Sequence, residues 1–453
     1  MMKSINPATE ELIGEYAVWT EQQVDRQLDA SATAFQKWRE TTFAERKKLM
    51  LALAAGLRKE QAVYARLITS EMGKPISEAN AEIEKCAWVC EFYAEQAESF
   101  LAPAPVETSA SKSYLRYDPL GSVLAVMPWN FPFWQVFRFL APNLMAGNVG
   151  LLKHASNVQG CALAIQKLVN ETGFPEDVWA TLPVNSSAIE QVIKHPQVKA
   201  VTLTGSEAAG RAIAAQAGKE IKKSVLELGG SDPFIVLSDV DIEEVAAMAI
   251  KGRMLNTGQS CIAAKRFIVQ ADIIQDFQEA LIQQIKNLKV GDPLDHDTDL
   301  GPLARQDLRE ELHAQVEKSL QQGAKLLCGG HPLKRTGYFY APTLLTDVIP
   351  ENCAFTEEIF GPVAVLIEAA SVEEAIQLAN QSSFGLGSSI WTRNIELAEQ
   401  LASQIESGAV FINEIVKSDP RISFGGIKNS GYGRELGQPG IYEFMNVKTV
   451  WVK

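Results

Sequence analysis

The residue in this sequence with the clearest chemical potential is Cys261, which ends the small polar run Asn256-Thr257-Gly258-Gln259-Ser260. The run falls between a predicted helix and a predicted strand, where loops commonly present functional side chains. A lone cysteine is most often a small buried hydrophobe. A thiol in a polar loop, however, can be exposed enough to ionise and to attack an electrophilic carbon. We therefore interpret Cys261 as a covalent nucleophile.

A candidate general base lies upstream at Glu227, at the end of an apolar strand and directly before Leu228-Gly229-Gly230. The glycines allow close backbone approach, and burial at a strand end would raise the pKa of the carboxyl toward a range that suits activation of water. A strand-end glutamate in a structural salt bridge is the alternative. None of the five histidines has a context typical of a cysteine hydrolase, which favours Glu227 as the base.

A third candidate is the amide of Asn130, which stands between two prolines in Pro128-Trp129-Asn130-Phe131-Pro132. An amide fixed in this way could donate a hydrogen bond to a developing oxyanion. The same segment could equally be only a rigid turn.

Two further features could bind phosphate or ribose. Thr204-Gly205-Ser206 follows the predicted strand Ala200–Leu203 and precedes a predicted helix. Such a strand-turn-helix can direct backbone N–H groups at a pyrophosphate, although the usual Gly-x-Gly-x-x-Gly pattern is absent. Lys153 ends another predicted strand and could supply a cation, with a solvated lysine as the equal alternative.

The bulk composition of the 453-residue chain is that of a globular protein, with 46% hydrophobic and 21% charged residues. Its net charge of −13 argues against a nucleic-acid partner. The N-terminus has no apolar signal core, and Val123–Leu140 is interrupted by prolines and polar residues, so we expect neither secretion nor a membrane span. Six scattered cysteines suit a cytoplasmic location, and no histidine accompanies Cys86 and Cys90, so we expect no metal site.

The elements that would position these residues begin with a helical region. Apolar residues recur at helical spacing from about residue 20 to residue 101, and Thr20 with Gln23 has the pattern of a capping box. Pro103-Ala104-Pro105 is typical of a linker, and residues 111–117 alternate as in an exposed strand.

Beyond this strand the texture changes, and short apolar runs alternate with amphipathic helices up to Gly230. That order is typical of a parallel sheet with helices on both faces. A second alternating unit follows Gly230. The tail, residues 447–452, indicates an isolated terminal strand that is free to pair with another edge or another chain.

Taken together, the motifs resemble those of the aldehyde dehydrogenase superfamily, and the resemblance covers essentially the whole chain in order. The motifs that carry it are Pro128–Pro132, Lys153, Thr204–Ser206, Glu227–Gly230 with Gly258–Cys261, Glu357–Pro362, and the glycine-rich segment Phe424–Glu435. The resemblance implies that Cys261 attacks an aldehyde and that the Asn130 side chain and the Cys261 backbone N–H bind the oxyanion. Glu227 would then activate the water that hydrolyses a thioester.

The resemblance also implies an NAD or NADP cofactor, with Lys153 and Ser206 on its adenosine side and Glu358 and Phe360 around the nicotinamide. The full set of implied cofactor residues is Trp129, Lys153, Ser156, Thr204, Gly205, Ser206, Leu228, Glu358 and Phe360. Many family members carry a glutamate three residues after the lysine, where this chain has Ser156. Because no carboxylate repels a 2′-phosphate there and Ser156 can hydrogen-bond to it, we predict that NADP is accepted or preferred.

For the substrate, the chain resembles the short bacterial succinate-semialdehyde dehydrogenases, in length and in the runs Lys153–Ala155 and Leu228–Phe234. Arg138 falls where those enzymes place an arginine for the distal carboxylate, and Ser418 lies in the loop expected to complete the pocket. Where relatives carry a second arginine before the cysteine, this chain has Leu255. We expect oxidation of succinate semialdehyde to succinate, with broader aliphatic or aromatic aldehyde specificity as the alternative.

The fold implied by the resemblance is α/β and has three parts. Residues 1–100 and 120–229 would form a Rossmann-type dinucleotide-binding domain, and residues 230–435 an α/β catalytic domain. Residues 101–119 and 436–453 would form a small β oligomerisation arm. The arm leads us to expect a homodimer or homotetramer that acts on a small-molecule aldehyde, with no nucleic-acid or membrane partner.

Overall fold

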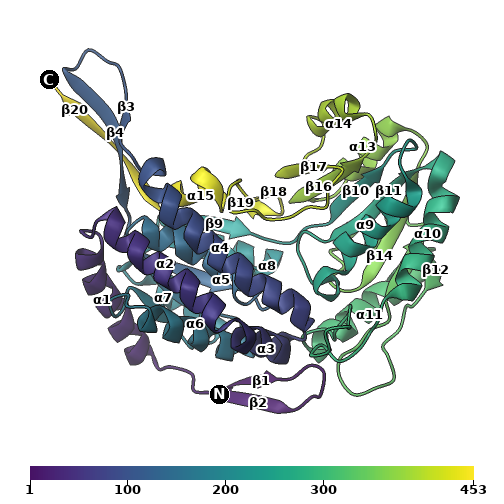
Figure 1. The fold of residues 1–453 in the computed structure, drawn as a ribbon, viewed down its shortest axis with the longest axis horizontal. Helices are drawn as coiled ribbons and strands as arrows, with labels where there is room; N and C mark the ends of the chain where they lie inside the picture. The colour runs from purple at the N-terminus through teal and green to yellow at the C-terminus, as the bar shows by residue number, and fades with distance from the viewer.

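Two large β-sheets, each covered by helices on both faces, form the body of the molecule in a computed structural model that describes residues 1–453 (Figure 1). The first sheet has six strands in the order β19-β9-β8-β5-β6-β7, and all of them except β19 are parallel. The strands are β5 (Ser122–Met127), β6 (Val149–His154), β7 (Trp179–Thr181), β8 (Val198–Thr204), β9 (Lys223–Glu227) and β19 (Gly431–Tyr432). The alternating parallel sheet predicted before Gly230 is therefore confirmed.

Alternate residues of the first sheet point into two separate cores. On β5, Val123 and Ala125 pack in the core shared with α5 and α6, whereas Leu124 packs on the other face with residues of α1, α7 and α8. Burial of both faces explains why these strands are almost continuously apolar. The covering helices are α1 (Glu21–Trp38), α5 (Trp134–Met145), α6 (Gln159–Glu171), α7 (Ile189–Lys194) and α8 (Glu207–Lys219).

The N-terminal helical region continues with α2, α3 and α4, and α4 packs against α2, α3 and α5. The predicted capping box is present at the start of α1, where Gln23 N–H donates to Thr20 Oγ1 at 3.4 Å and Thr20 N–H donates to Gln23 Oε1 at 2.9 Å. A short antiparallel hairpin of β1 and β2 precedes the helices. The bounds are β1 (Met2–Ile5), β2 (Leu12–Tyr16), α2 (Phe43–Lys59), α3 (Gln61–Met72) and α4 (Ile76–Phe100).

The second sheet has seven strands in the order β12-β13-β14-β11-β10-β16-β17, and only β12 is antiparallel to its neighbour. Helices α9 and α10 pack on one face, and α11, α13 and α14 pack on the other. The elements are β10 (Asp232–Val236), α9 (Ile242–Met254), β11 (Ala264–Gln270), α10 (Ile274–Asn287), α11 (Gln306–Gln321), β12 (Lys325–Cys328), β13 (Thr343–Thr346), α12 (Cys353–Thr356), β14 (Val363–Ala369), α13 (Val372–Asn380), β16 (Gly387–Trp391), α14 (Ile395–Ala402) and β17 (Ala409–Ile412).

After the second sheet the chain returns to the first. Strand β18 (Ile427–Lys428) pairs with β15 (Phe384–Gly385), and the following strand, β19, pairs with β9 of the first sheet. Helix α15 (Gly437–Tyr442) then packs against α4 and α5. The C-terminal segment therefore links the two sheets at the place where β9 ends.

A three-stranded antiparallel sheet projects from the body as an arm (Figure 1). It consists of β3 (Ala104–Pro105), β4 (Lys112–Pro119) and β20 (Met445–Val452), with β4 and β20 paired along their whole length. The exposed strand and the terminal strand expected from the sequence are thus partners of one another. None of the helices combines the length and the apolar composition needed to cross a lipid bilayer.

Candidate active site

A cavity of about 550 Å³ lies where strands β8 and β9 of the first sheet end. Its lining comes from both sheets and their connecting loops, so the fold brings together motifs that are far apart in the sequence. The predicted residues that line it are Trp129, Asn130, Thr204, Gly205, Ser206, Leu228, Cys261, Glu358 and Phe360. Five predicted residues lie outside the lining, namely Arg138, Lys153, Ser156, Glu227 and Ser418.

The loop before the nucleophile is held in a strained conformation. Asn256 and Thr257 both have φ of +55°, a region that costs about 1–3 kcal/mol for a residue other than glycine. Hydrogen bonds fix the strained residues, since Asn256 N–H donates to Glu78 Oε2 at 2.7 Å and Gly301 N–H donates to Thr257 Oγ1 at 3.0 Å. The loop therefore presents Cys261 from a rigid backbone.

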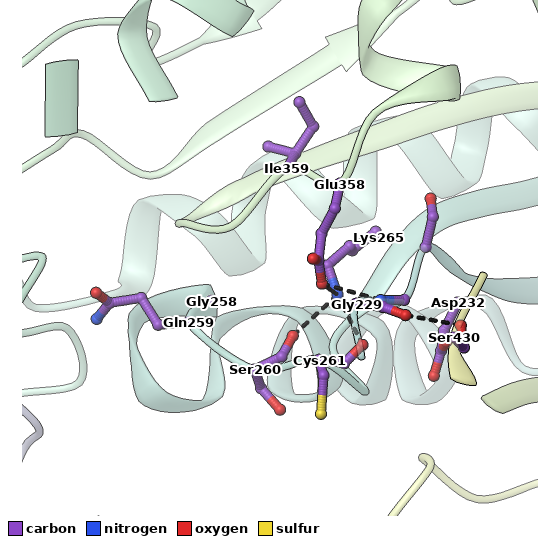
Figure 2. A network of polar contacts seen from close by, with 12 residues as sticks. Gly229, Asp232, Gly258, Gln259, Ser260, Cys261, Lys265, Glu358, Ile359 and Ser430 are labelled. Carbon is purple, nitrogen blue, oxygen red and sulfur yellow. Dashed lines mark hydrogen bonds and ion pairs between the residues drawn. The ribbon is translucent and has the colours of Figure 1, made fainter. Parts of the chain in front are cut away.

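A buried lysine completes the support of this loop. Lys265, on β11, donates to the carbonyl oxygens of Ser260 at 2.9 Å and Cys261 at 2.8 Å, and its ammonium lies 3.3 Å from Glu358 Oε1. Figure 2 shows the lysine between Glu358 and the nucleophile loop, with the Cys261 sulfur directed away from it. Glu358 also accepts the Gly230 N–H at 3.0 Å, so one carboxylate ties the loop to the end of the first sheet.

The Cys261 thiol is partly exposed in the cavity but surrounded by protein. Burial raises the pKa of the Cys261 thiol to about 12, and the positive charges of Arg138 and Lys265 oppose this rise. The free thiol is thus protonated at neutral pH. Formation of the reactive thiolate requires a proton acceptor or additional stabilisation when ligands bind.

Asn130 lies beside the nucleophile loop, as its proposed role requires. The Asn130 side-chain Nδ2 donates to the backbone carbonyl oxygen of Gln259 at 3.1 Å. The backbone carbonyl oxygen of Asn130 accepts a hydrogen bond from Asn256 Nδ2 at 2.8 Å. An amide nitrogen carries two N–H donors, so one remains for another acceptor. The Oδ1 atom of Asn130 is buried without a partner.

The turn that carries Asn130 is anchored by a buried histidine. His154 Nε2 lies 2.9 Å from the Pro132 carbonyl oxygen, and Nδ1 lies 2.9 Å from the Ala155 N–H. Burial lowers the pKa of His154 to about 4, so the ring is neutral at pH 7. A neutral ring with a proton on Nε2 can donate to Pro132 and accept from Ala155 at the same time.

Glu227, the last residue of β9, lies behind the cavity and is 2% exposed. Neither of its side-chain oxygens has a hydrogen-bond partner. Burial raises the pKa of Glu227 well above its ordinary value, the negative charge of nearby Glu435 adds to this, and Arg138 and Arg434 oppose it. A Cβ at Gly425 would lie 2.7 Å from Glu227 Oε1, so only glycine leaves room for the carboxyl.

Arg138, predicted to bind the substrate, forms a buried ion pair with Glu435. It also donates to Thr204 Oγ1 at 3.3 Å, and its guanidinium lies 4.7 Å from the centre of the Phe424 ring. In this structure the arginine is therefore engaged with the protein. Arg138 lies one helical turn after Trp134 on α5. The indole N–H of Trp134 donates to Ser418 Oγ at 3.0 Å.

The arginine nearest to the position of Leu255 is structural. Arg253 donates to the carbonyl oxygens of Gly258, Ile359, Gly361 and Val363, and is fully buried. Leu255 itself is 38% exposed. Arg253 therefore does not take the place of an arginine at position 255.

Three residues predicted to bind the cofactor, Thr204, Gly205 and Ser206, line the cavity at the start of α8, whereas Lys153 and Ser156 lie outside its lining. Ser206 caps α8 by accepting the Ala209 N–H at 3.4 Å, and the free N–H groups of the first turn of a 13-residue helix favour an anion. Lys153 is half-buried, and burial lowers its pKa. Ser156 is exposed at the first position of a 3₁₀ turn, so its hydroxyl is accessible.

Comparison with known proteins identifies the chain at this point. A model described as the aldehyde dehydrogenase family matches residues 1–450. The chain belongs to the aldehyde dehydrogenase family. The predicted resemblance and the predicted fold class are thus confirmed.

Two relatives of this aldehyde dehydrogenase match it over 99% of both chains. A protein of Synechocystis sp. named probable succinate-semialdehyde dehydrogenase (NADP+) is 52% identical, and succinate-semialdehyde dehydrogenase (NADP+) 1 of Mycobacterium tuberculosis is 49% identical. A crystal structure of succinic semialdehyde dehydrogenase from Streptococcus pyogenes, with NADP+ as the cofactor, matches with a TM-score of 0.98. It is 38% identical and covers the full length of both chains.

Two polar residues of this aldehyde dehydrogenase that hold the site were missed by the sequence reasoning, Lys265 and His154. A signal for the lysine exists, because Lys265 and Arg266 are adjacent cations in an otherwise apolar strand that directly follows the nucleophile. Buried cations need polar partners, so a functional neighbour could have been inferred. His154 gave no such signal, since the carbonyl oxygens that its ring contacts, those of Met127 and Pro132, come from a different part of the chain.

Proposed function

We propose that this aldehyde dehydrogenase oxidises succinate semialdehyde to succinate with NADP or NAD. The observation that carries the proposal is the similarity, over 99% of the chain, to enzymes named for this substrate at 52% and 49% identity. The side chains around the cavity supply a nucleophile, an oxyanion donor and a base. The position of Arg138 behind the cavity supplies a cation for a carboxylated substrate.

In the proposed reaction, the Cys261 thiolate attacks the aldehyde carbon and forms a thiohemiacetal. The second N–H of the Asn130 amide and the backbone N–H of Cys261 would bind its oxyanion. Because Lys265 and Asn256 fix the loop and Asn130, these donors would be oriented before the substrate arrives. Orientation of this kind lowers the reorganisation that the reaction requires.

Glu227 would act after oxidation, as the base for the water that hydrolyses a thioester on Cys261. Its raised pKa makes the carboxylate a stronger base than an exposed glutamate. Its two oxygens lack partners, so both can accept a proton or a hydrogen bond from water. A movement of the side chain toward the cavity is part of the proposal, because Glu227 lies outside the cavity lining.

The cavity fits a nicotinamide dinucleotide. A Cβ at Gly229 would lie 2.3 Å from Glu358 Oε2, so glycine keeps the floor of the cavity open beside a carboxylate suited to a ribose. The first turn of α8 would hold the pyrophosphate, with Thr204, Gly205 and Ser206 at its start. The bound cofactor supplies the oxidant, by accepting a hydride from the substrate carbon.

The remaining proposed cofactor residues would contact the two ends of the dinucleotide. Trp129, Leu228 and Phe360 would pack against the nicotinamide end, and Lys153 and Ser156 would contact the adenosine ribose. The hydroxyl of an exposed serine at position 156 can donate a hydrogen bond to a 2′-phosphate, and the side chain carries no repelling charge. This supports use of NADP as well as NAD, in line with the NADP in the names of the relatives.

The test is a purified-enzyme panel that crosses aldehydes with the two cofactors and follows reduced nicotinamide absorbance. Succinate semialdehyde should give the highest kcat/KM among succinate semialdehyde, butanal, hexanal and benzaldehyde, and NADP should support turnover. A failure to oxidise succinate semialdehyde faster than butanal would reject the substrate. A failure to use NADP would reject the cofactor prediction separately.

The second candidate function is a dehydrogenase for a wider range of aliphatic or aromatic aldehydes. The observation that favours it is the Arg138–Glu435 ion pair, because an engaged arginine is less available for a substrate carboxylate. Arg138→Ala discriminates between the two candidates. A loss confined to succinate semialdehyde supports the first, and an equal loss for butanal supports the second.

We further propose that the arm of β3, β4 and β20 mediates assembly into a homodimer or homotetramer. Its terminal strand leaves Val447, Trp451 and Val452 exposed at 53%, 55% and 46%, a large apolar content for a free edge. Sedimentation of the full chain and of a Trp451→Lys variant tests the assignment. A monomeric wild type, or an unchanged oligomer in the variant, would reject it.

The cytoplasmic location stays a prediction. All six cysteines are free thiols in this structure, as a reducing compartment requires. Fractionation of cells that express a tagged full-length chain would test it.

A further inference from the structure

A basic side chain without a counter-ion stands next to two residues of the proposed substrate site. Lys85, on α4, donates to Ser418 Oγ at 2.8 Å, and its ammonium lies 4.4 Å from the centre of the Trp134 ring. The indole N–H of Trp134 donates to the same hydroxyl at 3.0 Å. Helix α4, helix α5 and the loop after β17 therefore meet at Ser418.

No carboxylate forms an ion pair with Lys85, and the nearby Asp419 and Glu82 act on its ammonium only from a distance. Asp419 is held by Arg421 at 2.6 Å, and Glu82 is paired with Lys74. Glu82 also accepts the backbone N–H groups that begin α5. Both acids are thus committed to other donors, and Lys85 is left with a neutral hydroxyl and an aromatic face.

Electrostatics agree with this geometry. Burial, together with the positive charge of Arg138, lowers the pKa of Lys85 to about 8. Two cations held near each other in a partly buried site repel one another. An arriving anion would relieve that repulsion and would gain charge-assisted hydrogen bonds.

The cluster lies at the start of α5, directly after the turn that carries Asn130. Asn130, Trp134 and Arg138 are spaced by four residues, so Trp134 and Arg138 share one face of the helix, with Asn130 next to its start. The charge of Arg138 acts on both the Cys261 thiol and the Lys85 ammonium, which places this arginine near each of them. Gln135, next to Trp134 on α5, lines the cavity beside Cys261. In the proposed site, an aldehyde at Cys261 extends its far end along α5 toward Lys85 and Ser418.

We infer that Lys85 is a specificity-determining residue that binds the distal carboxylate of the substrate together with Ser418 and Arg138. The inference rests on the proposed function and goes beyond it, by assigning a cation on α4 to the recognition of a carboxylated aldehyde. Lys85 would exchange part of its contact with Ser418 for the carboxylate. Trp134 would keep the hydroxyl of Ser418 oriented.

The experiment compares succinate semialdehyde with butanal, which also has four carbons but carries a methyl group in place of the carboxylate. Lys85→Met removes the charge, Lys85→Gln keeps a donor without the charge, and Lys85→Arg keeps the charge. Lys47→Met is the control, because Lys47 is an exposed lysine on α2 whose ion pair with Glu95 also contacts α4.

Loss of a charge-assisted hydrogen bond should raise KM for succinate semialdehyde by about 10- to 100-fold in Lys85→Met and Lys85→Gln. The kcat for this substrate and the kcat/KM for butanal should stay close to wild type. Inhibition by succinate should weaken by a similar factor. Lys85→Arg should recover most of the affinity, and Lys47→Met should change neither substrate.

An equal loss for both aldehydes in the Lys85 variants would show a structural role and overturn the inference. Unchanged kinetics would show that the carboxylate does not reach Lys85 and would also overturn it. If Lys85→Met fails to fold, Lys85→Gln and Lys85→Arg still decide the question. If the wild type oxidises butanal as efficiently as succinate semialdehyde, the proposed function itself is rejected. If the wild type prefers succinate semialdehyde and the Lys85 variants keep that preference, only the role of Lys85 is rejected.

Discussion

The two sides of Cys261 are built in opposite ways. On the side of the cavity, the charged groups have partners, since Lys265 binds two backbone carbonyls and Glu358, and Glu358 accepts a backbone N–H. On the buried side, both oxygens of Glu227 lack hydrogen-bond partners, and a second buried carboxylate, Glu435, lies nearby with Arg138. Buried polar groups that have hydrogen-bond partners keep the surrounding backbone in place. Buried polar groups without partners remain free to bind a proton or a water molecule.

The difference has a physical reason. A partnered buried charge is costly to move, because movement exposes both ions to an apolar surrounding. An unpartnered carboxyl is costly to keep as an ion, and burial therefore raises its pKa. The cavity side therefore sets geometry, and the buried side provides a group that can exchange protons. The predictions below test this division.

The largest effect is expected at the atom between the two sides. Cys261→Ala should lower aldehyde oxidation by at least about 10⁴-fold, because no other nucleophile lines the reactive end of the cavity. Titration with NADPH, followed by the fluorescence of its reduced nicotinamide, should give a Kd close to that of the wild type. Retained turnover would break the assignment of the nucleophile, and loss of NADP binding would show that the thiol also supports the cofactor side.

The next effect is expected on the buried side. Glu227→Gln should lower steady-state kcat by about 10²- to 10⁴-fold while leaving a burst of reduced nicotinamide, since hydrolysis of the thioester would be slowed. Stopped-flow absorbance measures both phases. A loss of the burst together with the steady state would place Glu227 before oxidation.

The pH dependence of kcat, compared between the wild type and Glu227→Gln, gives a second test of the role of Glu227. Glu227 must be a carboxylate to accept a proton from water, and burial raises its pKa. Wild-type kcat should therefore fall as the pH drops through a range above that of an ordinary glutamate. The Glu227→Gln variant should lose this acidic limb, and a limb that persists would assign it to another group.

The sequence indicated the groups that are proposed to carry the chemistry more readily than it indicated the groups that hold them. Cys261, Glu227 and Asn130 each stand in a short motif of glycine, proline or small polar residues, and such motifs are visible without a structure. The capping box at Thr20 and the two long strands of the arm were also indicated by local patterns, whereas the pairing of those strands with each other was not. The fold class, which depends on the order of strands and helices, was predicted as well.

The supporting contacts were not predictable because they join distant parts of the chain. Lys85 and Ser418 are 333 positions apart, and Asn256 and Glu78 are 178 positions apart. No local pattern indicates which buried acid a buried base will meet. The pairing of Arg138 with Glu435, which changes how available the arginine is, is a consequence of tertiary packing alone.

A smaller effect on activity and a clear effect on stability are expected from this pair. Arg138→Met should destabilise the folded protein by about 3–5 kcal/mol, because it leaves Glu435 buried and unpaired. The double variant Arg138→Met with Glu435→Gln should recover much of that loss. Urea unfolding followed by tryptophan fluorescence compares the midpoints, and equal midpoints for the single and double variants would show that the ion pair is not what the arginine supports.

The smallest effect is expected on the cofactor side, far from Cys261. Ser156→Glu should raise KM for NADP by about 10- to 100-fold through repulsion of the 2′-phosphate, with KM for NAD nearly unchanged. Ser156→Ala is the matched control, since it removes only a neutral hydroxyl. Because the partnered groups around Glu358 would fix the proposed nicotinamide end, kcat with saturating cofactor should stay near wild type in both variants. A fall in kcat with NAD would mean that position 156 influences the geometry at Cys261. The groups on the cavity side would then not hold that geometry fixed.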